Sequence, residues 1–152
     1  MKFIRVLKSY VEDRSQKNDY NYEISRKYII KFPHYSFDYK EGELEQKIMQ
    51  EKQTCKDIIT SEFLEIYDSS KKTYELKYVI TTQWGKEDDS YLGEIILNKY
   101  KDGDVVISGN YSTSRQTRYF NSHQIDSEND LALYIDKFLT LIIKHATEYR
   151  EY

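Results

Sequence analysis

Three residue types that often mark special chemistry or architecture are scarce in this chain, which has one cysteine, one proline and five glycines among 152 residues. The single cysteine, Cys55, excludes an internal disulfide framework and suits a reducing compartment. The glycines lie far apart, so there is no phosphate-cradling loop. The longest apolar run, Phe138–Ile143, is much shorter than the about 20 residues that cross a bilayer. We therefore expect a cytoplasmic protein that does not associate with membranes.

Charge of either sign is not in large excess. The chain has 23 Lys+Arg against 26 Asp+Glu, a formal net charge of -3, and residues 1–40 are mildly basic while the remainder is acidic. A duplex DNA binder is usually more basic than this, and a DNA mimic is more acidic, so neither class is favoured. The first eight residues are interrupted by cations, so no signal peptide is predicted.

Tyrosine is the abundant residue type, with 16 copies against six phenylalanines and one tryptophan. Tyrosine combines apolar area with a polar tip and is enriched at recognition surfaces. An AT-rich genome is the alternative explanation, because lysine, isoleucine and asparagine are abundant as well. The tyrosines are spread along the whole chain, which favours the compositional explanation.

The strand pattern is clearest between residues 61 and 114. Thr73–Trp84 alternates apolar and polar side chains with a period of two, which is typical of a strand buried on one face. Three further runs complete the pattern: Glu62–Tyr67, Tyr91–Lys101 and Val105–Thr113. Asp102-Gly103 suits a tight turn between the last two. We predict an antiparallel four-strand meander.

Helices are predicted on both sides of the meander. Ser127 and Asp130 resemble a capping box, and apolar residues follow at spacings of three and four, which predicts a helix over 127–148. Two more helices are predicted over 2–13 and 42–60, with strand pieces at Tyr22–Phe32 and Tyr35–Tyr39 between them. Pro33 indicates a sheet edge or a break there. The predicted fold is one α+β domain, 1–152, with helices packed mainly on one sheet face.

Candidate catalytic and metal-ligating residues do not form a recognised pattern. His34-Tyr35-Ser36 and His145-Ala146-Thr147 each resemble the H-x-[ST] half-motif of two-histidine phosphoesterases, whose histidines face each other as general base and acid. His145, however, falls within a predicted helix rather than a strand. The three histidines and Cys55 lack metal-ligand spacing, so we predict no catalytic set, metal or cofactor.

One group of residues is the candidate binding site. Alternate loops of a meander lie at the same end of the sheet, so the loop after Trp84 and the segment after Thr113 are expected to meet. Arginine and aromatic side chains beside a helix N-terminus can bind an anion, a stacked base or an acidic protein surface. Phe120 and His123 are expected near by. The candidate partner-binding residues are Trp84, Tyr91, Arg115, Arg118 and Tyr119.

These observations predict a small non-catalytic binding protein that docks on another macromolecule. Phage antagonists of host proteins and immunity or inhibitor proteins have a similar profile, which is an analogy of class. The first alternative is an RNA or single-stranded nucleic-acid binder that stacks bases on Tyr74, Tyr78, Trp84 or Tyr111. The second is a phosphoesterase-like enzyme that uses His34. The edge near Pro33 leaves homodimerisation open as well.

Overall fold

The computed structural model describes residues 21–69, 73–100 and 102–144. In chain order, the elements are β1 (Asn21–Phe32), the short 3-10 turn η2 (Ser36–Asp38), α1 (Glu43–Ser69), β2 (Thr73–Trp84), β3 (Ser90–Lys99), β4 (Val105–Ser112), β5 (Thr117–Tyr119), β6 (His123–Ile125) and α2 (Glu128–Lys144). The predicted helix over 2–13 lies outside the described residues, as does the end of the one predicted over 127–148.

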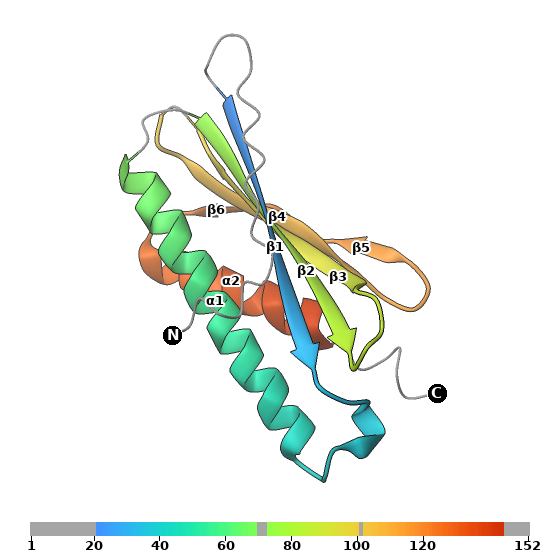
Figure 1. The fold of residues 1–152 in the computed structure, drawn as a ribbon. Coiled ribbons are helices and arrows are strands. Elements are labelled where there is room, and N and C mark those ends of the chain that lie inside the picture. Colours follow the sequence, from blue (N-terminus) through green and yellow to red (C-terminus); the bar gives the residue numbers. More distant parts are fainter. Residues whose placement is uncertain (1–20, 70–72, 101, 145–152) are drawn as a thin grey trace.

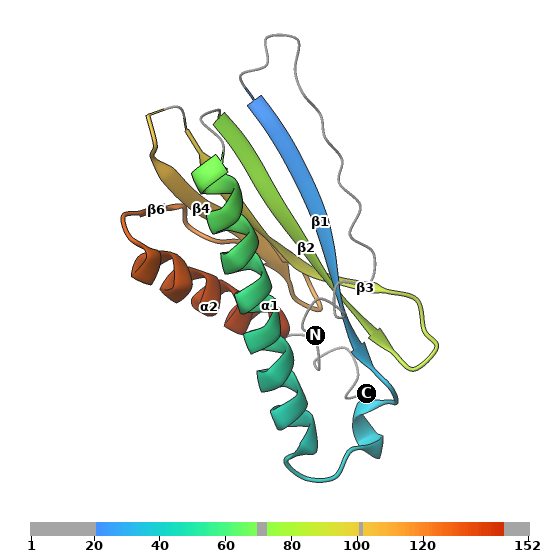
Figure 2. The same ribbon diagram turned by 60° about the vertical axis from the view of Figure 1, so that its left-hand side comes forward.

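The strands form one mixed, mostly antiparallel sheet in the order β1-β2-β3-β4-β5, with β6 also paired to β4. Both helices lie on the same face of this sheet, and α2 crosses α1 (Figures 1 and 2). Lys52 and Lys56 of α1 both reach Asp136 of α2, at 3.5 and 3.7 Å. The predicted α+β class, with helices on one face, is therefore confirmed.

The first predicted strand of the meander is wrong, because Glu62–Tyr67 continues α1. Cys55, Ile59 and Phe63 repeat every four residues and are buried. The apolar stripe of the predicted helix over 42–60 therefore continues into Glu62–Tyr67. Glu62 also pairs with Arg26 of β1, with Oε2 and Nε 2.8 Å apart. The long helix therefore packs along its full length, and the antiparallel part of the sheet starts at β2.

The N-terminal strand is the edge of the sheet among the described residues, as Pro33 predicted. It pairs with β2 in parallel, from Asn21 opposite Thr73 to Phe32 opposite Trp84. Parallel neighbours need a crossover, and α1 provides it. The second predicted strand piece, Tyr35–Tyr39, is wrong: Ser36–Asp38 forms the short turn η2.

The core lies between the two helices and the sheet face that carries Tyr74, Leu76, Tyr78 and Ile80. Close packing of α2 depends on Gly93, where an added Cβ would lie 2.4 Å from the Asn110 carbonyl oxygen and 3.0 Å from Ile142. The predicted cap of α2 is confirmed by the Asp130 backbone N–H, which donates to Ser127 Oγ at 3.1 Å. Within the described part of the chain, no helix is long and apolar enough to span a membrane.

Candidate functional site

Four of the five predicted binding residues lie at one end of the sheet, where β3 starts and the β4–β5 hairpin turns. We call Tyr91, Arg115, Arg118 and Tyr119 the Tyr–Arg end. The turn that carries Arg115 is held by Thr113, whose backbone N–H donates to the Gln116 carbonyl at 2.9 Å. The Thr113 hydroxyl oxygen accepts from the Gln116 backbone N–H at 3.1 Å. The hairpin thus holds the arginines on a short ordered connection.

Tyr91 is fixed by a chain of polar contacts on the sheet face away from the helices. Its hydroxyl donates to Asn110 Oδ1 at 2.6 Å, and Asn110 Nδ2 donates to Glu94 Oε1 at 2.9 Å. Partial burial and the negative charge of Glu94 raise the pKa of Tyr91 to about 12. Tyr91 is therefore a neutral phenol at physiological pH, and its ring is held in place for contact.

The other three side chains of the Tyr–Arg end are open to solvent. Tyr119 is 79% exposed, and its position opposite Asn110 places it on the same sheet face as Tyr91. Arg118 lies opposite Tyr111 and so points to the other face. Neither Arg115 nor Arg118 forms an ion pair with any of the described residues. Arg115, in the turn, and Arg118, on the face opposite to the two tyrosines, are therefore exposed cations of this end that form no ion pair within the described chain.

Trp84 does not belong to this exposed group. It is fully buried and stacks on Phe32, with ring centroids 4.0 Å apart and an interplanar angle of 13°. Parallel pairing with β1 places Phe32 opposite Trp84, and Tyr39 packs on both rings edge to face. The expected role of Trp84 as a surface anchor is corrected by this burial.

Three further expectations about this end are corrected by the structure. Phe120 turns into the core and stacks on Phe138 of α2, with centroids 4.0 Å apart. His123 lies in β6 opposite Ile107, toward the other end of β4, and stacks on Tyr134. The N-terminus of α2 follows β6 and so lies away from the Tyr–Arg end as well. Both β5 and β6 pair with β4, β5 with its end and β6 with its start. The chain therefore runs back along β4 before α2 begins.

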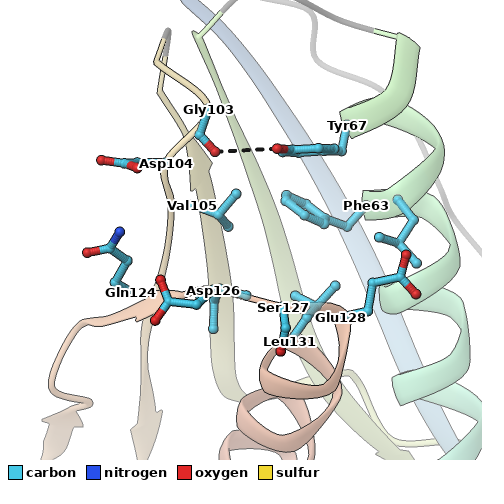
Figure 3. Close-up of a pocket in the computed structure, with 12 residues that line it drawn as sticks. Phe63, Tyr67, Gly103, Asp104, Val105, Gln124, Asp126, Ser127, Glu128 and Leu131 are labelled. Carbon is cyan, nitrogen blue, oxygen red and sulfur yellow. Dashed lines mark hydrogen bonds between the residues drawn. The ribbon is translucent and has the colours of Figure 1, made fainter.

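A pocket of about 370 Å³ occupies the opposite end of the molecule, and the sequence did not reveal it (Figure 3). It lies between the C-terminal turns of α1, the β3–β4 hairpin and the start of α2. We call it the acidic pocket, and its lining residues are Phe63, Leu64, Tyr67, Gly103, Asp104, Val105, Gln124, Ile125, Asp126, Ser127, Glu128 and Leu131. The available signal was acidity in two separate turns, Asp102-Gly103-Asp104 and Asp126-Ser127-Glu128.

The remaining chemical candidates do not assemble into a reactive site. Cys55 is fully buried, and burial raises the pKa of its thiol, so it is held as an unreactive thiol. His34 packs on Tyr39, with centroids 4.2 Å apart, whereas His145 lies outside the described residues. Residues 21–69, 73–100 and 102–144 contain no group of three or more His, Cys, Asp or Glu side chains that could hold a metal ion.

Comparison with known proteins finds no relative. No protein-family model, no curated protein and no solved structure matches the chain. The two candidate sites are therefore defined by this chain alone: the Tyr–Arg end at one end of the sheet and the acidic pocket at the other.

Proposed function

We propose that this protein is a non-catalytic binding protein that docks on an acidic surface of another protein through the Tyr–Arg end. The observation that supports this proposal is Tyr119, which is 79% exposed on the same face as Tyr91, at an end of the sheet where the exposed Arg115 and Arg118 form no ion pair with a described residue. Arginine and tyrosine dominate the binding energy of protein interfaces. An antagonist or immunity-type protein that blocks its target by occlusion would use such a surface.

The geometry of the Tyr–Arg end fits a docking surface more closely than a catalytic one. Tyr91 is held by its hydrogen bond to Asn110, so little side-chain entropy would be lost when a partner covers it. The arginines are long, exposed and unpaired within the described chain, so they can steer an acidic partner and form bidentate contacts to its carboxylates. We expect Tyr119 to be the central anchor and the arginines to form the rim.

A nucleic acid is the weaker candidate partner. Base stacking was expected on Tyr74, Tyr78 and Trp84, and all three are buried beneath the helices. Tyr111 faces the same side and packs on Phe120, with centroids 5.2 Å apart. Two exposed arginines and a net charge of -3 offer little electrostatic attraction to phosphates.

The test is affinity capture from an extract of the cells in which the gene is expressed, with and without nuclease. The variants are Arg115→Ala/Arg118→Ala and Tyr119→Ala. We expect one stoichiometric protein that survives nuclease and is lost with both variants. Truncating an anchor at the centre of an interface typically costs about 2 kcal/mol or more, which is about a thirtyfold loss of affinity.

Matched controls are Lys40→Ala and Tyr100→Ala, which remove an exposed cation and a 45% exposed tyrosine elsewhere. These controls should retain the captured protein. Capture that disappears with nuclease would move the function to nucleic-acid binding. Capture that is equally strong with all four variants would reject the Tyr–Arg end as the docking surface.

A further inference from the structure

The acidic pocket has a mixed lining, with apolar side chains from α1, β4 and α2 and polar groups from the β3–β4 hairpin and the turn before α2. Figure 3 shows Phe63 and Tyr67 of α1 facing Gly103 and Val105 of the β3–β4 hairpin, with Leu131 below them. The Tyr67 hydroxyl donates to the Gly103 carbonyl at 3.5 Å and closes one side. Asp126, Ser127 and Glu128 lie where α2 begins, with the Asp126 carboxylate on the strand side and the Glu128 carboxylate on the α1 side. Its volume of about 370 Å³ is at the small end of the range of ligand pockets, and is suited to one long side chain.

All charged side chains that line the acidic pocket are carboxylates: Asp104, Asp126 and Glu128. Asp102 lies beside them, and its negative charge is the main reason that the pKa of Asp104 is raised, with Asp126 adding to it. None of these four carboxylates forms an ion pair with a residue in the described ranges. The described residues that line this partly apolar pocket therefore include three carboxylates and no cation.

Lys99 is the described cation that is placed near by, and it is already engaged. Its ammonium nitrogen donates to the Tyr67 carbonyl at 3.3 Å and lies 4.4 Å from the Tyr67 ring centroid. Lys99 is 7% exposed and is not among the residues that line the pocket. It supports the wall formed by Tyr67.

We propose that the acidic pocket receives an arginine side chain from a partner protein. The methylene groups would cover Phe63, Val105 and Leu131, because long basic side chains bury their stems on apolar surface and keep the charged head in water. The guanidinium group would then lie against Glu128 on the α1 side and form charge-assisted hydrogen bonds, while Asp126 on the strand side adds to the negative potential. This site is separate from the Tyr–Arg end and does not depend on the proposed function.

The test is a titration of the whole protein with N-acetyl-arginine-amide, followed by NMR of the backbone amides. We expect saturable shifts at Gly103, Val105 and Leu131 with a dissociation constant of about 1 mM, as befits a single side chain. The neutral isostere N-acetyl-citrulline-amide should give no saturable shift. The variant Asp126→Asn/Glu128→Gln should weaken arginine binding about tenfold, since each solvent-exposed ion pair contributes little alone.

The matched control is Asp88→Asn, which removes an exposed carboxylate from the β2–β3 loop at the other end of the sheet. This variant should bind the arginine probe as the unmodified protein does. Equal shifts with arginine and citrulline, shifts confined to the Tyr–Arg end, or no shift at all would overturn the proposal. A loss in Asp88→Asn as large as that in Asp126→Asn/Glu128→Gln would overturn it too, because binding would then follow net charge.

Discussion

At the scale of single residues, Trp84 has a structural role in the core rather than the binding role predicted for it. Its ring fills the end of the core, stacked on Phe32 and covered by Tyr39. We expect Trp84→Ala to lower the free energy of unfolding by about 3–5 kcal/mol, as for other large aromatic deletions in cores. Denaturant unfolding followed by circular dichroism measures this loss.

The same tryptophan, the only one in the sequence, is also its own spectroscopic probe. Its native fluorescence should be shifted to the blue and protected from acrylamide quenching. Trp84→Phe is the control, since it keeps a stacking ring and should lose less stability. Emission typical of an exposed indole, or an unchanged unfolding midpoint in Trp84→Ala, would contradict the buried position.

Tyr91 gives a pH-dependent prediction. Its pKa of about 12 in the folded protein lies above the ordinary value of 10.0, so folding favours the protonated phenol. The stability that this preference provides is complete below the ordinary pKa and is lost as the pH rises through the folded-state pKa. We therefore expect the stability difference between the unmodified protein and Tyr91→Phe to shrink between about pH 9 and about pH 11.

Denaturant midpoints at the two pH values test this expectation, with Tyr100→Phe as the control for a partly exposed tyrosine. At the lower pH, Tyr91→Phe should cost about 0.5–1.5 kcal/mol through the lost hydrogen bond to Asn110. A stability difference that stays constant with pH would show that the Tyr91 hydroxyl is not held as the structure has it.

The burial of Trp84 also shows which feature of the site could not be predicted from the sequence. The alternation in Thr73–Trp84 correctly predicted which side chains share the apolar face, including Tyr74, Tyr78 and Trp84. It carried no information on whether the end of that face is covered. The cover of Trp84 comes from Phe32 and Tyr39, which are about fifty residues away in sequence. Exposure at a strand end depends on such long-range neighbours.

At the scale of elements, the wrong strand prediction for Glu62–Tyr67 also affects the predicted sheet topology. Once this run is read as helix, the order becomes strand, helix, strand, which is the pattern that allows parallel pairing of β1 with β2. Reading it as a strand implied a hairpin instead. Six residues with three or four apolar positions fit either period, and the length of the preceding helix decides between them.

A proline at the predicted boundary between helix and strand distinguishes a helical Glu62–Tyr67 from an extended one. Ser61 is exposed and lies inside α1, so Ser61→Pro removes a backbone hydrogen bond without removing a core side chain. We expect a loss of about 3 kcal/mol in the free energy of unfolding, whereas Ser61→Ala should be nearly neutral. Had a helix ended and a strand begun there, proline would have been tolerated. An unchanged unfolding midpoint in Ser61→Pro would contradict a continuous helix.

At the scale of the whole molecule, the Tyr–Arg end and the acidic pocket lie at opposite ends of the sheet. β3 runs from the β2–β3 loop to the β3–β4 hairpin (Figure 1), so it starts beside Tyr91 and ends near Gly103 and Asp104 of the acidic pocket. Its ten residues span about 30 Å. The Debye length is about 8 Å at 0.15 M ionic strength and about 30 Å at 0.01 M. The two ends should therefore be electrically independent at physiological salt and coupled at low salt.

This separation predicts how the arginine probe responds to a change at the far end. At 0.15 M salt, Arg115→Ala/Arg118→Ala should bind N-acetyl-arginine-amide with unchanged affinity, because several Debye lengths screen the lost charges. At 0.01 M salt the same variant should bind the probe more tightly, since removing two positive charges makes the potential at the acidic pocket more negative. Lys40→Ala/Lys86→Ala is the charge-matched comparison. A changed affinity at 0.15 M salt, or a weaker affinity at 0.01 M salt, would contradict the separation of the arginines from the acidic pocket.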